Sequence, residues 1–240
     1  MQTYRSFIYK DAIYKIASSR YDSITATIIE QRHKLEKYID RHPEFLSSLV
    51  PINVNEDAPE IAKLMAHAAR SAFVGPMAAV AGAIAQAAVQ AAIKNGDTDA
   101  IVENGGDIFC ASSSDVVIGL YAGEGLLKDK LAFVVKPEMM PVSICSSSST
   151  MGHSLSFGNC ELATVVSESG ALADAAATFV CNSVKEISDI EPVLHKAMKI
   201  AGVLGILIVK SGRIGLIGRL PELVRNRDAL LSEKVTRFPS

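Results

Sequence analysis

The chain has 240 residues, 49% hydrophobic and 21% charged, a composition typical of a folded globular protein. Its net charge of −2 gives no overall field favouring nucleic acid or an anionic membrane, and with 6% aromatic residues and no Trp we expect no base-stacking surface for single strands. The N-terminus has no apolar signal-peptide core, and the apolar run Ala78–Ile93 is mostly alanine and short for a membrane span. We therefore predict a cytoplasmic protein without a membrane or nucleic-acid partner.

The first hundred residues predict a hairpin and three helices. Ser6–Lys10 and Ala12–Ala17 alternate apolar and polar residues around Lys10-Asp11, as in a β-hairpin. The first helix is predicted from its cap Ser23 to about Ile39. The second is predicted from Asp57, with Pro59 in the first turn, to the break at Gly75-Pro76. The third is predicted from Met77 to Lys94, where Asn95-Gly96 ends it.

The pattern changes to short apolar strands after residue 99. Runs with Gly, Ser, Asp or Pro between them predict strands at Ala100–Val102, Ile108–Ala111, Val116–Tyr121, Leu131–Val135, Val142–Cys145 and Leu162–Val166. Further on we expect a helix Ala171–Val184 capped by Ser169 and a helix from Asp189 to about Ile200. A hairpin of Gly205–Val209 with Arg213–Leu216 follows. After Arg225 we expect a frayed or loosely docked charged tail, residues 226–240.

This order of elements favours an α+β fold with mixed or antiparallel sheets and packed helices, because strands and helices come in runs and do not alternate. We expect one domain, 1–240, in which residues 1–110 and 111–225 form two similar halves. Oligomeric state is not encoded in any pattern, and a homodimer is compatible with the Ala- and Gly-rich surfaces.

Asp174 and Thr178 are the first candidate ligands. They are four residues apart, so they lie on one helix face with only alanine between them. A carboxylate and a hydroxyl are hard oxygen ligands that suit Mg²⁺ when phosphates complete its shell, and the helix start near Ser169-Gly170 favours anions. Alternatively, the Thr178 hydroxyl bonds back to the Asp174 carbonyl and Asp174 is merely solvated in the first turn.

The segment Glu103-Asn104-Gly105-Gly106-Asp107 joins two predicted strands. A hairpin turn at Asn104-Gly105 explains it structurally. The glycine pair would also let backbone approach a ligand, and the two flanking carboxylates could hold a cation or ribose hydroxyls.

Ser146–Thr150 is a run of hydroxyl residues after a strand, either a phosphate-cradling loop or a plain flexible one. His153 follows among small residues and is a candidate general acid or base. The cysteines form no CxxC motif and are expected to be buried thiols; a zinc site from Cys145, His153, Cys160 and Cys181 lacks the usual spacing.

Three motifs together resemble the ApbE family of magnesium-dependent flavin transferases, closest to its short, uncharacterised branch. They are the small-residue helix Gly75–Ala92 leading into Asn104-Gly105-Gly106-Asp107-Ile108, then Cys145–Ser149 with His153, then Ala173-Asp174-Ala175-Ala176-Ala177-Thr178. The third is similar to the family's Ala-Asp-x-x-x-Thr, and together they span about residues 75 to 182.

The resemblance implies that Asp174 and Thr178 hold Mg²⁺ against the diphosphate of FAD, from which FMN is transferred to a target hydroxyl or released by hydrolysis. It implies catalytic roles for His153 and Asp107. Binding of FAD or FMN would fall to the hairpin and the serine run: Glu103, Asn104, Gly105, Gly106, Ser146 and Ser147.

The chain departs from the family pattern at two points. Ala79-Val80-Ala81-Gly82 has no lysine where the family's flavin-site helix carries one before a glycine, and Ser154–Gly158 replaces a His-Pro-x-x-Gly stretch. Two alternatives to a flavin enzyme therefore stay open. One is a nucleotide-binding protein without transferase activity, and the other is an enzyme using Glu103, Asp107 and His153 as acid–base groups.

Overall fold

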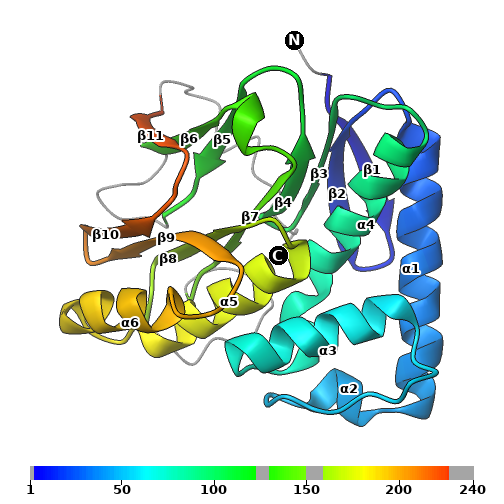
Figure 1. Ribbon diagram of the computed structural model, residues 1–240, viewed down its shortest axis with the longest axis horizontal. Helices are drawn as coiled ribbons and strands as arrows, with labels where there is room; N and C mark the ends of the chain where they lie inside the picture. The colour runs from blue at the N-terminus through cyan, green and yellow to red at the C-terminus, as the bar shows by residue number, and fades with distance from the viewer. Residues whose placement is uncertain (1–2, 123–129, 150–158, 227–240) are drawn as a thin grey trace.

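The fold is built on an eight-stranded sheet in which every pairing of the described strands is antiparallel. This computed structural model describes residues 3–122, 130–149 and 159–226 (Figure 1). The strands follow the order β1-β2-β3-β4-β7-β8-β9-β10. Their bounds are β1 Arg5–Tyr9, β2 Ala12–Ala17, β3 Ala100–Asn104, β4 Asp107–Ala111, β7 Val142–Ser147, β8 Leu162–Ser167, β9 Val203–Lys210 and β10 Arg213–Gly218.

A second, three-stranded antiparallel sheet has the order β11-β6-β5. It consists of β5 (Val116–Leu120), β6 (Leu131–Val135) and β11 (Glu222–Arg225). Its inner residues share a hydrophobic cluster with one face of the large sheet, so the two sheets pack face to face.

The helices cover the opposite face of the large sheet (Figure 1). They are α1 (Tyr21–Arg41), α2 (Glu44–Ser47), α3 (Glu60–Ala72), α4 (Val80–Lys94), α5 (Gly170–Ser183) and α6 (Ile190–Ala197), with 3₁₀ turns at Pro76–Ala79, Pro137–Met139 and Ile187–Asp189. α4 packs on β3 and β4, and α5 packs on β7 and β8. The result is three layers, α+β in class as the order of elements predicted.

Strand alternation divides the core into two clusters. In β9, Ile206 and Ile208 pack beneath the helices, whereas Leu207 and Val209 face the small sheet. Because successive strand side chains point to opposite faces, a strand buried on both sides is apolar along most of its length, as β9 is before its last residue, Lys210. The same alternation sorts the polar residues of the candidate site.

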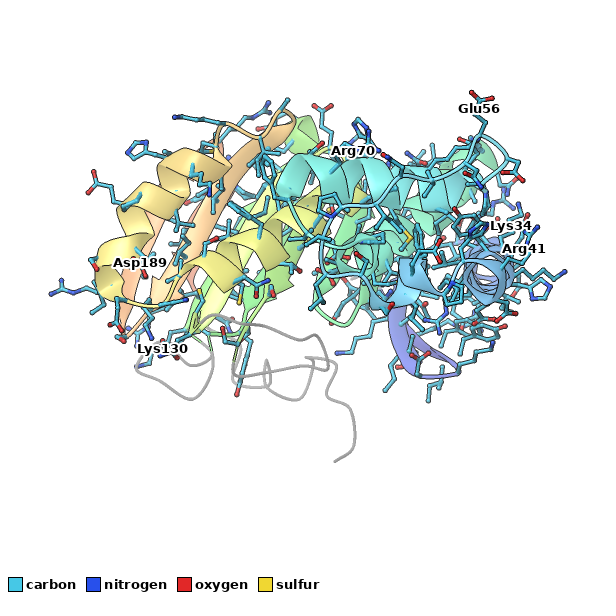
Figure 2. The ribbon with its side chains drawn as sticks, turned by 90° about the horizontal axis from the view of Figure 1, so that it is seen from below. Lys34, Arg41, Glu56, Arg70, Lys130 and Asp189 are labelled. Atoms are coloured by element: carbon cyan, nitrogen blue, oxygen red, sulfur yellow. The ribbon has the colours of Figure 1, made fainter. Side chains whose placement is uncertain are left out.

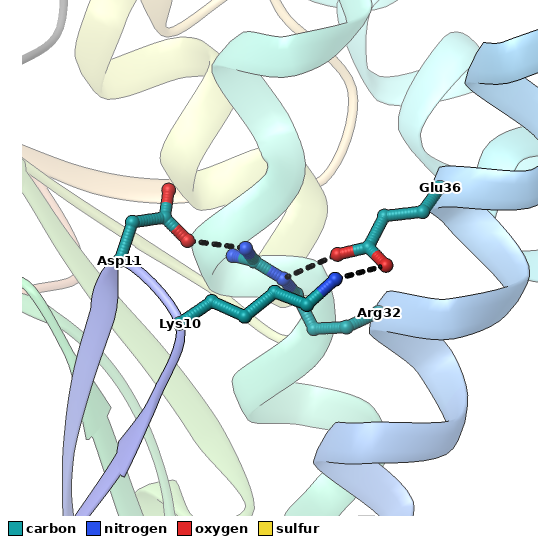
Figure 3. Close-up of polar contacts among 4 residues, drawn as sticks. All are labelled: Lys10, Asp11, Arg32 and Glu36. Atoms are coloured by element: carbon teal, nitrogen blue, oxygen red, sulfur yellow. Dashed lines mark hydrogen bonds and ion pairs between the residues drawn. The ribbon is translucent and has the colours of Figure 1, made fainter.

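The first hairpin is tied to α1 by ion pairs (Figure 3). Arg32 pairs with Asp11 in the turn between β1 and β2 and lies 3.8 Å from Glu36, and Lys10 Nζ lies 2.6 Å from Glu36 Oε2. This network links the turn at the edge of the sheet to α1 on the exposed surface.

Long-range contacts move several predicted boundaries. α1 begins at Tyr21 and not at Ser23, because the Asp97 carboxylate accepts hydrogen bonds from the Ser19 and Arg20 amides, 3.0 and 3.3 Å away. α3, which corresponds to the second of the predicted helices, begins at Glu60 with Pro59 as its extended N-cap, and not at Asp57.

Two further differences follow from strand pairing. β7 continues to Ser147 because Ser146 and Ser147 pair with β8, so these residues are strand and not loop. Arg225 likewise belongs to β11, paired with β6, and not to a frayed tail. The α2 turn and β11 have no counterpart among the predicted elements.

Figure 2 shows the charged side chains of Lys34, Arg41, Glu56, Arg70, Lys130 and Asp189 at the periphery of the molecule. By length and composition, Pro76–Lys94 is the one segment of the described residues that could cross a membrane, and half of its most apolar window is buried inside the fold. This segment packs against α1, α5 and the sheet, which is the position of a core helix.

Candidate functional site

The candidate site lies where the N-terminal ends of α4 and α5 cross. The backbones touch at Gly82 and Gly170: a Cβ added to either glycine would lie 2.2 Å from the carbonyl oxygen of the other. Only glycine allows this approach, since any side chain would overlap backbone atoms. The crossing therefore brings the positive ends of two helices to one place.

Each helix caps the other. The Asp174 carboxylate of α5 accepts a hydrogen bond from the Gly82 amide at 2.9 Å and another from the Ala81 amide. In return, the Gln86 side-chain oxygen of α4 accepts a hydrogen bond from the Gly170 amide at 2.7 Å. Ser169 is the local N-cap of α5, as predicted, and accepts from the Leu172 amide at 3.4 Å. Amides of the first helical turn, which have no partner within the helix, are thus satisfied from outside.

Asp107 approaches this crossing from the sheet. It opens β4, its side chain is 8% exposed, and its Oδ1 accepts a hydrogen bond from the Ser146 amide at 3.2 Å. The Cys145 thiol is a further hydrogen-bond partner of Asp107, and its sulfur also lies 3.7 Å from the Gly170 carbonyl oxygen. Cys145 therefore links the Asp107 side chain to the start of α5.

The pKa values of both carboxylates are raised. Burial raises the pKa of Asp107 well above its ordinary range, and the negative charge of Asp174 raises it further. Burial also raises the pKa of Asp174 to about 7, against the opposing effect of the hydrogen bonds from Gly82 and Ala81. Like charges enclosed together are unfavourable without a compensating cation, so this pair marks the site electrostatically.

The glycine pair forms the turn between β3 and β4. Asn104 pairs with Asp107, and Gly105 and Gly106 have φ of +65° and +102°. The two-residue turn is therefore at Gly105-Gly106, one position beyond the predicted Asn104-Gly105, because both central residues need positive φ. No atom lies within 4 Å of a Cβ built on either glycine, so the turn backbone is open to a ligand.

The sheet separates the residues expected to bind the cofactor. Asn104 and Asp107 lie on the helix face, where the Asn104 side-chain amide donates to the Ala81 carbonyl at 3.4 Å. Glu103 alternates to the opposite face, so it does not flank the turn with Asp107 as expected.

The serines divide in the same way. Ser147 is on the face of Asp107, whereas the Ser146 hydroxyl lies on the other face, 2.9 Å from the Thr164 hydroxyl. Ser146 can serve the site only through its backbone amide. His153 lies outside the described residues.

Thr178 lies one turn beyond Asp174 on α5, and its side chain is partly exposed. Among the hydrogen bonds of the described residues there is none between the Thr178 hydroxyl and the Asp174 carbonyl, the alternative that the spacing left open. Asp174 is not freely solvated either, since its carboxylate holds the start of α4. No group of three or more His, Cys, Asp or Glu in the described ranges is arranged to hold a metal ion. A cation here would rely on two carboxylates, a hydroxyl and oxygens of its ligand.

The cysteines are buried free thiols, as expected. Cys160 and Cys181 form a hydrogen-bonded pair, and Ser149 contacts both: its hydroxyl accepts from the Cys160 amide at 2.9 Å and lies 3.4 Å from the Cys181 sulfur. Cys145 belongs instead to the Asp107 site, so the described cysteines are not arranged as one zinc cluster.

Sequence reasoning missed Gln86 as part of this site, and it placed Gly82 and Cys145 in family-like motifs without a role for either. A signal was present: Gly82–Ala88 reads GAIAQAA and Gly170–Ala176 reads GALADAA. The two segments place Gln86 and Asp174 at equivalent positions, each four residues after its glycine. The pattern becomes informative only once the helices are known to cross.

The layers described here are those of the ApbE flavin transferases. The structure aligns with the ApbE protein of Thermotoga maritima at a TM-score of 0.59 and 12% identity, covering 99% of this chain and all (100%) of that one. It aligns with the flavinyl transferase ApbE of Pseudomonas stutzeri at a TM-score of 0.56 and 10% identity, covering 90% and 94% of the two chains. At these identities the likeness establishes the fold alone.

Sequence comparison adds the family. The chain belongs to the family described as AbpE bacteria, which matches residues 13–210. It is also 45% identical over 204 residues to a UPF0280 protein of Methanocaldococcus jannaschii, covering 82% of each chain. The predicted resemblance to the ApbE-like family is thereby confirmed.

Proposed function

We propose that this protein is a magnesium-dependent enzyme acting on a flavin nucleotide, either by transfer of FMN or by cleavage of the FAD diphosphate. The observation that supports the proposal most directly is the pairing of Asp107 and Asp174. These carboxylates come from a strand and a helix far apart in sequence, and burial together with the negative charge of Asp174 raises the pKa of Asp107. A divalent cation relieves that repulsion.

The residues present fit Mg²⁺ better than a softer metal. Asp107, Asp174 and Thr178 offer carboxylate and hydroxyl oxygens, the ligand type that Mg²⁺ accepts alongside substrate phosphates and water. Cys145 is adjacent, but burial and the nearby carboxylates raise the pKa of its thiol well above the ordinary range, so it stays protonated and is a poor ligand. Bound Mg²⁺ would supply neutralisation of the diphosphate charge.

The chain itself would orient the nucleotide. The open backbone of Gly105-Gly106 would allow close approach of the ligand, beside Asn104 and Asp107. The α5 N-terminus would contribute only the positive end of its helix dipole, because Gln86 and Ser169 already accept hydrogen bonds from its amides. The family and the flavin transferases that share its fold support FAD or a related flavin nucleotide as the proposed substrate class.

The proposal is tested by incubating the purified chain with FAD and Mg²⁺ and following FMN and AMP by chromatography. We expect product that requires Mg²⁺ and that is lost in Asp174→Asn, which retains a hydrogen-bond acceptor for Gly82. Ser169→Ala is the matched control on the same helix, because it removes a local cap without removing a carboxylate. Absence of both turnover and FAD binding in the folded protein would refute the proposal.

A second candidate is a nucleotide-binding protein that lacks transferase activity. The absence of lysine from Ala79–Gly82, at the start of α4, favours it, because this stretch forms the wall beside Asp174. It predicts that FAD with Mg²⁺ raises the melting temperature without FMN or AMP appearing. Turnover in the same assay would exclude it.

The third hypothesis, an acid–base enzyme using Glu103 with Asp107 and His153, has little support, since Glu103 and Asp107 face opposite sides of the sheet. A homodimer, a cytoplasmic location and the division into two similar halves remain predictions from the sequence. His153 as a catalytic group also remains a prediction.

A further inference from the structure

We propose that Gln86 is a positioning residue that orients Asp174 for cation binding, an inference that rests on the proposed function. Gln86 makes no contact with the Asp107 or Asp174 carboxylates in the described hydrogen bonds. Its side-chain oxygen instead accepts from the Gly170 amide at 2.7 Å, at the first residue of the helix that carries Asp174.

This hydrogen bond satisfies an amide that has no other route to a partner. Gly170 is buried, and the first amides of a helix have no acceptor within it. Losing the acceptor leaves a buried donor unpaired, which a protein relieves by shifting or fraying the helix end. Asp174 lies one turn from this point, so a shift of the first turn moves its carboxylate.

The glycine contact makes Asp174 sensitive to such a shift. Gly82 and Gly170 touch through backbone atoms, and the Gly82 amide is also the donor to Asp174 Oδ2 at 2.9 Å. The crossing is thus held by hydrogen bonds running in opposite directions, one from Gly170 to Gln86 and two, from Ala81 and Gly82, to Asp174. Removing the first leaves the hydrogen bonds to Asp174 as the remaining polar contacts between these helix ends.

The chemistry of Gln86 suits this role. It occupies in GAIAQAA the position that Asp174 occupies in GALADAA. A carboxylate at this position would accept the hydrogen bond from the Gly170 amide equally well, but it would add a negative charge near Asp107 and Asp174. A neutral amide keeps the acceptor without the charge.

The test compares Mg²⁺ affinity of the wild-type protein with Gln86→Leu, Gln86→Glu and Ser169→Ala, by calorimetric titration with MgCl₂ alone. Gln86→Leu keeps the volume but loses the acceptor, and we expect Mg²⁺ affinity to fall about tenfold. Gln86→Glu restores the acceptor and should return the affinity to at least the wild-type value. Ser169→Ala also removes a cap from the start of α5, but it has no link to α4, and its affinity should stay within about twofold of the wild type.

The Gly82 amide resonance in a ¹⁵N correlation spectrum is a second readout, because that amide donates directly to Asp174. It should move in Gln86→Leu and stay in place in Ser169→Ala. If the wild type binds no Mg²⁺ in this titration, the role of Gln86 in cation binding is overturned, whereas the proposed function is judged separately by the assay with FAD and Mg²⁺. Equal behaviour of Gln86→Leu and Ser169→Ala in both measurements, or an unmoved Gly82 resonance, would overturn the inference.

Discussion

The Asp174 carboxylate accepts a hydrogen bond from the Gly82 amide at 2.9 Å, across 92 positions of sequence. This one contact joins the start of α4 to the candidate metal ligand on α5. It also shows why Asp174 cannot be understood from its own helix: its spacing from Thr178 indicates a shared face, but its hydrogen-bond partners come from another element.

Asp107→Asn should stabilise the metal-free protein while abolishing its response to Mg²⁺. The substitution removes the cost of burying an ionisable carboxyl group close to Asp174 but keeps an oxygen to accept from the Ser146 amide. We expect the free energy of unfolding near pH 8 to rise by about 1–2 kcal/mol without divalent ions. Thermal melting with and without MgCl₂ measures both effects. A loss of stability in the metal-free variant would contradict the assignment of Asp107 and Asp174 as a repelling pair.

Gly170→Ala should destabilise the fold, because a Cβ at this position would lie 2.2 Å from the Gly82 carbonyl oxygen. Forcing α4 and α5 apart should cost about 1–3 kcal/mol, the range for overpacking, although alanine is the better helix former. Urea denaturation gives the difference.

Gly105→Asn is the matched control for the glycine contact. Gly105 has φ of +65° with open space around it, and Asn tolerates this conformation. We expect a change below about 0.5 kcal/mol. The interpretation fails if Gly170→Ala proves as harmless as Gly105→Asn.

Asp99 should make stability depend on pH in the acid range. The Ser113 amide and the Ser112 hydroxyl each donate to its carboxylate at 2.8 Å, and these hydrogen bonds lower its pKa to about 2. Because the folded pKa is below the unfolded value, the stabilisation is fully present above about pH 4 and is lost as pH falls towards 2.

Allowing for solvent screening, Asp99 should contribute about 1 kcal/mol over that interval. Urea melts at several pH values compare the wild type with Asp99→Asn, in which this share of the pH dependence should disappear. An unchanged slope in Asp99→Asn would show that other carboxylates account for the acid sensitivity.

Asp11→Ala should have little effect, despite the prominence of its ion pair with Arg32 in Figure 3. The Asp11 side chain is 79% exposed, and exposed ion pairs contribute about 0–1 kcal/mol. Arg32 also keeps Glu36 as a neighbour, 3.8 Å away. Chemical denaturation in low salt checks this, and a loss above about 2 kcal/mol would mean that the pair holds the hairpin more strongly than its exposure implies.

Local patterns in the sequence were sufficient for most elements. The first hairpin, the Ser169-capped helix and the final hairpin are where alternation and capping predicted them. These signals depend on neighbouring residues alone. Predicted element boundaries were wrong where the contact that sets them comes from a residue distant in sequence. Examples are Asp97 at the start of α1 and β6 beside Glu222–Arg225.

The same distinction between local and long-range contacts applies to the candidate site. The sequence was enough to mark Asp174 with Thr178 and Gly105-Gly106 with Asp107 as polar segments on a helix and at a turn, because spacing and turn chemistry are local properties. Tertiary structure decided the rest: it brought Asp107 to Asp174 and turned Glu103 and the Ser146 hydroxyl to the far face of the sheet. It also made Gln86 the cap of a helix 84 positions away. The physical reason is that electrostatic coupling and helix capping depend on distance in space, which the crossing of α4 and α5 sets and no single segment of sequence contains.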